Sequence, residues 1–413
     1  MAQLNITLNQ DESLQLFQAG NAKDLLRTLV QKSLNQLLAA ESALQLRADS
    51  YQRSDERTDY RNGTRQRELK TRVGTIILNV PRHRNRPFKT MIFEEYSRSE
   101  AALVATMAEM VVNGVSTRKV SKVMETLCDT SFSKSTVSEI CKKLDQEVEA
   151  FRSRPLTGSY PFVTIDATYF KVREKGRIVS KAFMVAIGTN ENGRQEILGF
   201  GTYDNESRET WTAFLTSLKK RGLTGVLMMT SDAHAGILHG MSRVFPNVPW
   251  QRCQFHFTRN IVGKAPKKYQ AGLRGELTEM FQCKTLEEAR KRKEEIISEY
   301  EDAAEEAMRC LDEGFESAMT VMLLPRGLQV YYRTSNSIER LNRELKRRSN
   351  VIGIFCNEAS IIRLMGSVLV ETNDRWQQNR AIFSPATYQK LIGGDLELKL
   401  IKLAKEQQQL LAA

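Results

Sequence analysis

The sequence predicts an α/β core that carries an all-helical insertion and follows a mainly helical N-terminal region. Between residues 158 and 265, three strand-like runs are followed by helix, strand, helix and strand. This alternation stops at Pro266, where a charged segment with a helical pattern begins. The chain has 413 residues, a length that favours about two to four compact units over one hydrophobic core.

An amphipathic helix is predicted close to the N-terminus. Leucine and valine recur at helical spacing from Lys23 to Leu46, which places them on one face. That face packs either on its own domain or on a second copy of the chain, and the periodicity favours neither. We therefore assign residues 1–60 to a helical segment for which dimerisation is one of two expected roles.

A DNA-binding region is predicted at residues 61–153. Two short strands are expected within Glu68–Val80, followed by a basic loop. From Arg61 to Lys89 there are nine Lys or Arg residues against one acid, Glu68. The cations expected to contact DNA phosphates are Arg65, Arg67, Lys70, Arg72, Arg82, Arg84 and Arg86.

Three helical segments are predicted within Glu100–Glu149, and a capping box at Thr136–Glu139 is expected to start the third. This arrangement fits a helix-turn-helix, although an ordinary three-helix bundle fits the pattern equally well. The neighbouring basic stretch favours DNA binding. In a helix-turn-helix, the residues at the start of the third helix that would face base edges are Lys134, Ser135 and Thr136.

The core is predicted to begin after a boundary at Arg154–Gly158. Its expected elements are strands at Phe162–Val172, Ile178–Gly188 and Glu196–Tyr203, a helix at Arg208–Arg221, a strand at Gly225–Asp232, a helix, and a strand-like run at Trp250–Phe257. This is the order of a ribonuclease-H-like α/β fold, and it would place the ends of the first and fourth strands side by side. The expected parts are the first half of the core at 158–265, the helical insertion at 266–327, the second half of the core at 328–385 and a helical tail at 386–413.

Carboxylates occupy strand ends in this arrangement. Asp166 closes the apolar run that begins at Val163, and Asp232 closes the run that begins at Leu227. A single aspartate at a strand end is more often a cap or turn residue, but two in this strand order favour a shared site. A later polar helix would bring in Glu339 as a third carboxylate.

Three such carboxylates predict a divalent-metal site. Oxygen ligands suit Mg²⁺, with Mn²⁺ as a substitute, and disfavour zinc. Two Mg²⁺ ions held about 3.5 to 4 Å apart can clamp both sides of a phosphoryl transfer. Asp204 and Glu206, which follow the third strand, are rival carboxylates, although Tyr203–Glu206 also fits a plain turn.

The helix of Glu339 is predicted to carry cations on the same face. Arg343 and Lys346 follow Glu339 at i+4 and i+7, so a carboxylate for metal and cations for phosphate would project together. The residues expected to form the inward stripe of this helix are Ile338, Leu341 and Leu345.

Cys253 and His256 have the spacing of a zinc-ligand pair. A structural zinc needs four ligands, and no second pair follows at a suitable spacing. We therefore expect a buried cysteine and a hydrogen-bonded histidine beside the active site. His234, two residues after Asp232, either approaches DNA or sits on the first turn of a helix.

Composition narrows the cellular setting. The formal charge of +12 favours a polyanionic partner, with a merely basic soluble surface as the alternative. The six cysteines include no close pairs, which fits a reducing cytosol. No leader or membrane-length apolar segment is evident, so we expect a cytoplasmic protein without a membrane partner.

Four segments together resemble the signature blocks of the Mutator-type transposases of bacterial insertion sequences, the insertion sequence 256 group. They are Thr164–Tyr169, Ser231–Gly236, Arg252–His256 and Thr334–Asn342. The resemblance spans essentially the whole chain. It implies that Asp166, Asp232 and Glu339 form a DDE triad, that the Cys-x-x-His pair is a family hallmark and that residues 266–324 are the all-helical insertion.

The resemblance also implies a reaction and partners. It implies Mg²⁺-dependent cleavage of double-stranded DNA at terminal inverted repeats and transfer of the 3′-hydroxyl to target DNA, by a copy-out, paste-in route through a circular intermediate. A homodimer is expected because two element ends must be brought together, and the bacterial nucleoid is the expected location. The rival hypotheses are a helix-turn-helix regulator without catalysis and a structure-specific nuclease on the same scaffold.

Overall fold

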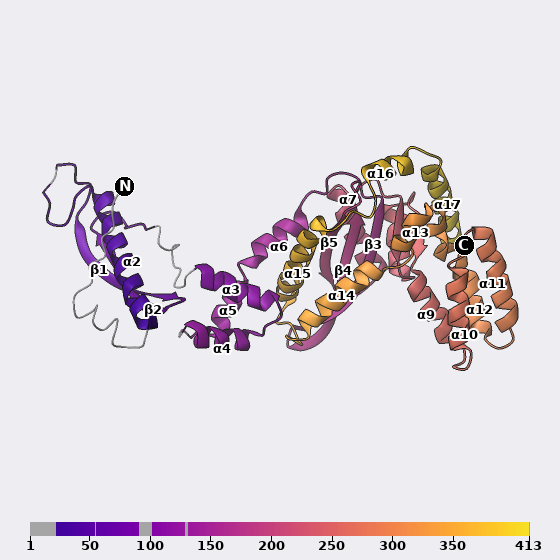
Figure 1. The fold of residues 1–413 in the computed structure, drawn as a ribbon, viewed down its shortest axis with the longest axis horizontal. Helices are drawn as coiled ribbons and strands as arrows, with labels where there is room; N and C mark the ends of the chain where they lie inside the picture. Colours follow the sequence, from indigo (N-terminus) through magenta and orange to yellow (C-terminus); the bar gives the residue numbers. More distant parts are fainter. Residues whose placement is uncertain (1–21, 54, 91–100, 129–130, 413) are drawn as a thin grey trace. The chain divides into compact units, whose positions relative to one another are not determined.

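The structure is a computed structural model that describes residues 22–53, 55–90, 101–128 and 131–412 (Figure 1). The chain divides into two compact units, residues 1–143 and 144–413. Within the described ranges, no helix has both the length and the apolar character needed to cross a membrane.

The first unit opens with a helix packed on a β-hairpin. Helix α2 (Ala22–Leu46) confirms the predicted amphipathic helix. The hairpin strands β1 (Arg61–Thr71) and β2 (Gly74–His83) pair antiparallel and are longer than the sequence predicted. Apolar side chains alternate along β2 and meet one face of α2, which explains the hairpin's single buried face. The core of this pair consists of Leu38, Leu69, Ile76, Leu78 and Val80.

The described part of the first unit also contains the short helices α3 (Ala101–Val112), α4 (Thr117–Cys128) and α5 (Lys134–Cys141). The predicted third segment is too long, because it breaks after Cys141 and α6 (Leu144–Ser153) follows in the second unit. The predicted capping box at Thr136 is also wrong. Ser133 is the N-cap, because its hydroxyl accepts the Thr136 N–H at 3.0 Å and the helix starts one turn earlier.

The second unit is built on a five-stranded mixed sheet with the order β5-β4-β3-β6-β7. Its strands are β3 (Phe162–Glu174), β4 (Arg177–Thr189), β5 (Gln195–Tyr203), β6 (Met228–Ser231) and β7 (Trp250–Arg252). Strands β3, β4 and β5 run antiparallel, whereas β6 is parallel to both β3 and β7. The first and fourth predicted strands are therefore neighbours, as the element order required.

Helices cover both faces of this sheet (Figure 1). Helices α7 (Arg208–Lys220) and α8 (Ala235–Val244) pack on one face through Trp211, Leu215 and Ile237. Helices α14 (Asn336–Ser349) and α15 (Glu358–Gln378) contact β3, and α15 also contacts β5 and α6. Burial on both faces explains why β4 is apolar almost without interruption from Ala182 to Ile187.

The insertion is helical, as predicted, and has its own apolar core. It follows α9 (Gln254–Lys264) and comprises α10 (Gln270–Met280), α11 (Leu286–Tyr300), α12 (Glu305–Ala318) and the short 3₁₀ helix η1 (Thr320–Leu323). The chain continues through α13 (Arg326–Tyr332) to α14 and α15, and ends in α16 (Pro385–Ile392) and α17 (Leu396–Ala412).

Two predicted strands are shorter in the structure. The run Trp250–Phe257 is a strand only as far as Arg252, because α9 begins at Gln254 and buries Phe257 and Ile261 at helical spacing. The strand predicted to start at Gly225 is paired only from Met228.

Candidate active site

Asp166 of β3 and Asp232 after β6 lie at the same level of two adjacent parallel strands. Val163 pairs with Met229 and Thr164 with Thr230, so Asp166 and Asp232 each follow the paired stretch by two residues. Strand β6 ends at Ser231, so Asp232 closes its strand as predicted. The prediction that Asp166 also closes a strand is wrong, because β3 stays paired with β4 beyond Asp166 as far as Glu174. Burial and the nearby charge of Asp232 raise the pKa of Asp166 to about 7.

Helix α14 supplies a side chain that contacts the first aspartate directly. Asn342 Nδ2 donates a hydrogen bond to Asp166 Oδ2 at 2.8 Å. The other amide atom, Asn342 Oδ1, is buried and has no hydrogen-bond partner among the described residues. The predicted inward stripe of this helix is confirmed, because Ile338 and Leu345 have no exposed surface and Leu341 has 4%. Glu339 lies one turn before Asn342.

The Glu339 carboxylate belongs to a compact polar network. The Ser335 hydroxyl lies 2.9 Å from Glu339 Oε1 and 3.1 Å from Cys253 Sγ, and it can donate to either. The Ser335 backbone N–H also donates to Cys253 Sγ at 3.3 Å. His256 Nε2 lies 3.9 Å from Glu339 Oε1. Ser335 thus occupies the N-cap position of α14, but its hydroxyl serves this network and makes no capping hydrogen bond.

The Cys253 and His256 side chains have shifted pKa values. Burial raises the pKa of the Cys253 thiol, but contacts with His256 and Ser335 outweigh burial and lower it. The Cys253 sulfur is the main cause that raises the pKa of His256 to about 9, and Glu339 and Asp166 add to the effect. Cys253 is fully buried, as predicted. The residue pair therefore lies beside both Glu339 and Asp166.

The two rival carboxylates, Asp204 and Glu206, have different neighbours in the structure. Glu206 is half-buried, and its charge contributes to the raised pKa of Asp166, although less than burial and Asp232 do. Asp204 instead forms an ion pair with Lys181 at 2.5 Å. Of the two rivals, the structure brings only Glu206 toward the aspartates.

His234 lies on the first turn of a helix, which was one of its two expected positions. Its ring Nδ1 accepts the Gly236 N–H at 3.2 Å and caps α8. Its backbone N–H donates to Asp232 Oδ1 at 3.3 Å. His234 therefore connects Asp232 to the start of α8.

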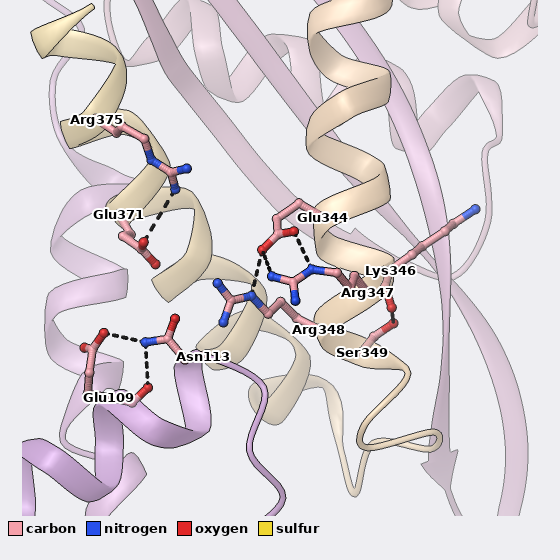
Figure 2. Close-up of polar contacts among 9 residues, drawn as sticks. All are labelled: Glu109, Asn113, Glu344, Lys346, Arg347, Arg348, Ser349, Glu371 and Arg375. Carbon is pink, nitrogen blue, oxygen red and sulfur yellow. Dashed lines mark hydrogen bonds and ion pairs between the residues drawn. The ribbon is translucent and has the colours of Figure 1, made fainter.

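The cations predicted on α14 are exposed. Neither Arg343 nor Lys346 makes an ion pair with any residue in the described ranges. Figure 2 shows Lys346 extending away from a separate cluster in which Glu344 binds Arg347 and Arg348 at 2.7 and 2.8 Å. The Lys346 amino group is thus free for an external anion.

The basic hairpin of the first unit has an ordered loop. Asp59 accepts the backbone N–H groups of Asn85 and Arg86 at 2.9 and 2.8 Å, which fixes the loop after β2. The exposed predicted cations here are Arg65, Arg72, Arg82, Arg84 and Arg86, whereas Arg67 and Lys70 are half-buried.

Lys70 has an internal role. Its ammonium donates to the Ser131 carbonyl at 2.5 Å and lies 4.7 Å from the centre of the Phe132 ring. At the start of α5, Lys134, Ser135 and Thr136 are exposed, as a contact surface requires.

Asn342 was not predicted as a site residue. Its signal was the i+3 spacing from Glu339, which puts an amide within reach of whatever the carboxylate faces. Ser335 was not predicted as a site residue either. Its contact with Cys253 spans 82 residues and has no local signal.

The donor set fits hard cations better than zinc. Among the described residues, Cys253, His256 and Glu339 each bring one ligand atom within 4.8 Å of the others. Structural zinc takes four ligands, and here Ser335 already occupies the sulfur and the carboxylate. By contrast, Asp166 and Asp232 carry adjacent carboxylates, and Asn342 Oδ1 is an unpartnered buried oxygen beside them. Oxygen ligands of this kind suit Mg²⁺.

Comparison with known proteins gives consistent matches over nearly the whole chain. Residues 1–379 match the family model described as Transposase, Mutator family. The chain is 40% identical over 379 residues to the transposase for insertion sequence element IS256 in transposon Tn4001 of Staphylococcus aureus, covering 91% of this chain and 97% of that protein.

Relatives from other organisms match to a similar degree. The transposase for element ISRM5 of Rhizobium meliloti is 39% identical over 360 residues, covering 87% of this chain and 90% of the relative. The transposase for element IS1081 of Mycobacterium tuberculosis is 38% identical over 375 residues, covering 89% and 88%.

Proposed function

Because the chain belongs to the Mutator family of transposases, we propose that it is the transposase of a bacterial insertion sequence and uses a DDE triad on a ribonuclease-H-like core. The triad is Asp166, Asp232 and Glu339. The reaction has two parts: hydrolysis of a phosphodiester at the element end, which leaves a 3′-hydroxyl, and attack of that hydroxyl on a target phosphodiester.

The observation that carries this proposal is the meeting of β3, β6 and α14. Asp166 lies within β3 and Asp232 directly follows the neighbouring parallel strand β6, and the charge of Asp232 helps to raise the pKa of Asp166. Asn342, one turn after Glu339, hydrogen-bonds Asp166. These elements are far apart in the sequence, so a purely structural origin for three acids at one place would require a balancing cation. Among the described residues, none of the three forms an ion pair with Lys or Arg. Their cationic neighbour is His256, which lies 3.9 Å from Glu339 and has a pKa raised to about 9, so one positive charge faces three acids.

The residues fit two Mg²⁺ ions, which Mn²⁺ can replace. Asp166, Asp232 and Glu339 would hold the ions, which when bound supply Lewis acidity at the attacking and departing oxygens. Asn342 orients the Asp166 carboxylate, and Ser335 with His256 orients that of Glu339. The exposed Arg343 and Lys346 are available to contact phosphates of the bound DNA.

We assign DNA recognition to the first unit. The exposed arginines around Asp59 would contact phosphates, and α3 to α5 would act as a helix-turn-helix, with the start of α5 reading base edges in the terminal inverted repeats. A homodimer would bring two element ends together. The copy-out, paste-in route through a circular intermediate and a location at the nucleoid complete the proposal.

The decisive experiment compares two strand-end aspartates. Asp232→Asn should retain binding to element-end DNA and lose Mg²⁺-dependent cleavage by at least about 1,000-fold, because it removes a metal ligand. Asp204→Asn is the matched control, since it also removes a strand-end charge but from the Lys181 ion pair. Equal cleavage by both variants would reject the triad.

A second experiment addresses the binding surface. Neutralising Arg82, Arg84 and Arg86 should weaken binding to all DNA sequences and reduce the slope of affinity against salt concentration. Lys70→Ala is a control in the same hairpin, because that ammonium is already engaged by Ser131 and Phe132. An unchanged salt slope in the triple variant would move the DNA surface elsewhere.

Two rival functions give different results with purified protein. A structure-specific nuclease would cleave DNA but would not join a 3′-hydroxyl end to target DNA. A non-catalytic regulator would bind DNA equally well with and without divalent metal and would not nick it.

A further inference from the structure

A groove is lined by residues of α9, of α10 and of the segment before α14. Figure 1 shows where α9, α10 and α14 lie in the second unit. The groove has a volume of about 530 Å³. Its walls include Phe255 and Arg259 from α9, Arg274 from α10, and Arg333 with Thr334 from the α13–α14 connection. The groove therefore combines residues of the helical insertion with residues that flank the candidate active site.

The groove is positively charged. Its three arginines lie among lining residues that include no Asp or Glu. Within the described ranges, none of the three makes an ion pair, unlike the cations on α11. There, Arg290 binds Glu316 at 2.9 Å and Lys293 binds Asp312 at 2.6 Å. The insertion thus pairs Arg290 and Lys293 of α11 internally and leaves the arginines at the groove available to an anion.

An exposed aromatic ring lies in the same groove. Phe255 is 50% exposed, although the large aromatic side chains of the neighbouring core, such as Phe257, are buried. Its ring meets the His256 ring edge-on, with centroids 5.6 Å apart. His256 in turn lies 3.9 Å from Glu339. Phe255 of the groove thus contacts His256, and His256 lies beside the proposed metal-binding carboxylate of Glu339.

We propose that this groove binds unpaired nucleotides of the DNA strand next to the cleaved phosphodiester, with a base stacked on Phe255 and phosphates contacted by Arg259, Arg274 and Arg333. This inference rests on the proposed transposase function and adds a substrate subsite to it. Cationic side chains that follow the backbone and an aromatic ring that stacks a base are the two components of sequence-tolerant binding to single strands.

The dimensions favour a single strand over a duplex. Cavities of about 300–1,000 Å³ hold ligands the size of one or two nucleotides, and this groove falls within that range. A base inside a duplex has both faces covered by its stacked neighbours, whereas an unpaired base that leaves the stack has a free face for Phe255. Unpaired nucleotides would also bring the scissile phosphate close to Glu339 without moving a whole duplex into the site.

A local fluorescence probe tests the stacking contact. The full-length protein in EDTA is titrated with a short single-stranded oligonucleotide that carries 2-aminopurine at each position in turn. Stacking on Phe255 should quench the probe at one position, and Phe255→Leu should remove the quench. Phe255→Trp should retain it, since the aromatic face is kept. Quenching that is identical in Phe255→Leu would overturn the proposal.

Anisotropy measurements test the phosphate contacts. The double variant Arg259→Ala and Arg274→Ala should bind the single strand about 10-fold or more weakly, with a smaller salt dependence. Both side chains are exposed, so folding should be unaffected, which a thermal melt checks. Arg290→Ala is the matched control, because it removes one cation from the same insertion outside the groove. An equal loss in the control, or an equal loss for fully paired duplex, would contradict a single-strand site.

The outcomes separate this inference from the proposed function. If Asp232→Asn abolishes cleavage while the groove variants bind single strands normally, only the groove assignment fails. If Asp232→Asn still cleaves, the triad fails, whereas position-specific quenching that depends on Phe255 would still establish the groove as a nucleotide site.

Discussion

Two clusters of three carboxylates lie on the sheet of the second unit, and they differ in the source of their balancing charge. Glu174, Asp204 and Glu358 surround the buried ammonium of Lys181 at 3.2, 2.5 and 3.2 Å. The acids of the candidate active site have neutral amide and hydroxyl neighbours, Asn342 and Ser335, and a cationic neighbour on their rim, the His256 imidazole, whose pKa is raised to about 9.

The difference distinguishes a structural cluster from a binding one. The Lys181 cluster is neutralised internally, and its acids raise the pKa of Lys181, with Asp204 as the largest contributor. It ties the ends of β3 and β5 to the start of α15. In the active-site cluster, burial and like charge raise the pKa of Asp166 to about 7. A carboxylate whose charged form is destabilised in the folded chain gains stability when it binds a cation from solution.

The largest effect should come from Asp166→Asn. If Asp166 holds metal as proposed, cleavage should fall by at least about 1,000-fold because a metal ligand is lost. In EDTA, however, the free energy of unfolding should stay level or rise by about 1 kcal/mol, because a buried like-charge repulsion disappears. Cleavage assays and urea unfolding measure the two quantities. A clear loss of stability would mean that Asp166 is structural.

Lys181→Met should give the opposite result. Removing the cation leaves three carboxylates facing one another, so the free energy of unfolding should fall by about 1–3 kcal/mol. The DNA-cleavage rate of the folded fraction should stay within a few-fold of the original. Loss of cleavage without loss of stability would erase the distinction between the two clusters.

Magnesium should stabilise only one cluster. Millimolar MgCl₂ should raise the melting temperature by about 2–4 °C, as expected for a ligand that binds only the folded state. The shift should disappear in the double variant Asp166→Asn and Asp232→Asn and persist in Lys181→Met. Differential scanning fluorimetry gives both values, and a shift that survives in the double variant would assign the metal elsewhere.

The smallest effect is expected at Glu344, a carboxylate that forms ion pairs with two arginines. Arg347 is the main cause that lowers the pKa of Glu344 to about 2, and Arg348 adds to it (Figure 2). Because the folded-state pKa is depressed, this contribution to stability is complete above about pH 4.5 and is lost as the pH falls toward about 2. Glu344→Gln should therefore cost about 0.5–1 kcal/mol at neutral pH, and the difference from the original chain should shrink at acidic pH in urea unfolding. A difference that is constant with pH would exclude this ion pair as its source.

The sequence predicted the elements that have strong periodicity. The strands β3, β4 and β5, the helices α2 and α7 and the apolar stripe of α14 follow from local patterns of two or 3.6 residues. The ends of helices were harder to predict. The N-cap role of Ser133 and the turn after Cys141 depend on which of several local hydrogen bonds forms.

The site was predictable in part for a similar reason. Strand order alone put Asp166 beside Asp232. The contacts of Asn342 with Asp166 and of Ser335 with Cys253 depend on how α14 is rotated about its axis against the sheet. That rotation is set by packing of side chains from distant segments, for which one sequence holds no local signal. Likewise, the sequence offers no reason to prefer Glu206 over Asp204 as a site residue. The distinction appears only in the structure, where Lys181 pairs with Asp204.

The hydrogen bond between Asn342 and Asp166 joins residues 176 positions apart. At a synthesis rate of about 5–20 residues per second, the ribosome needs roughly 9 to 35 s to cover that distance. Asp166 and Asp232 are therefore synthesised well before α14, the helix that carries Glu339 and Asn342. Under the proposed function, a chain terminated in the insertion would keep the first unit, to which DNA binding is assigned, and would lack Glu339, so it would occupy DNA without cutting it.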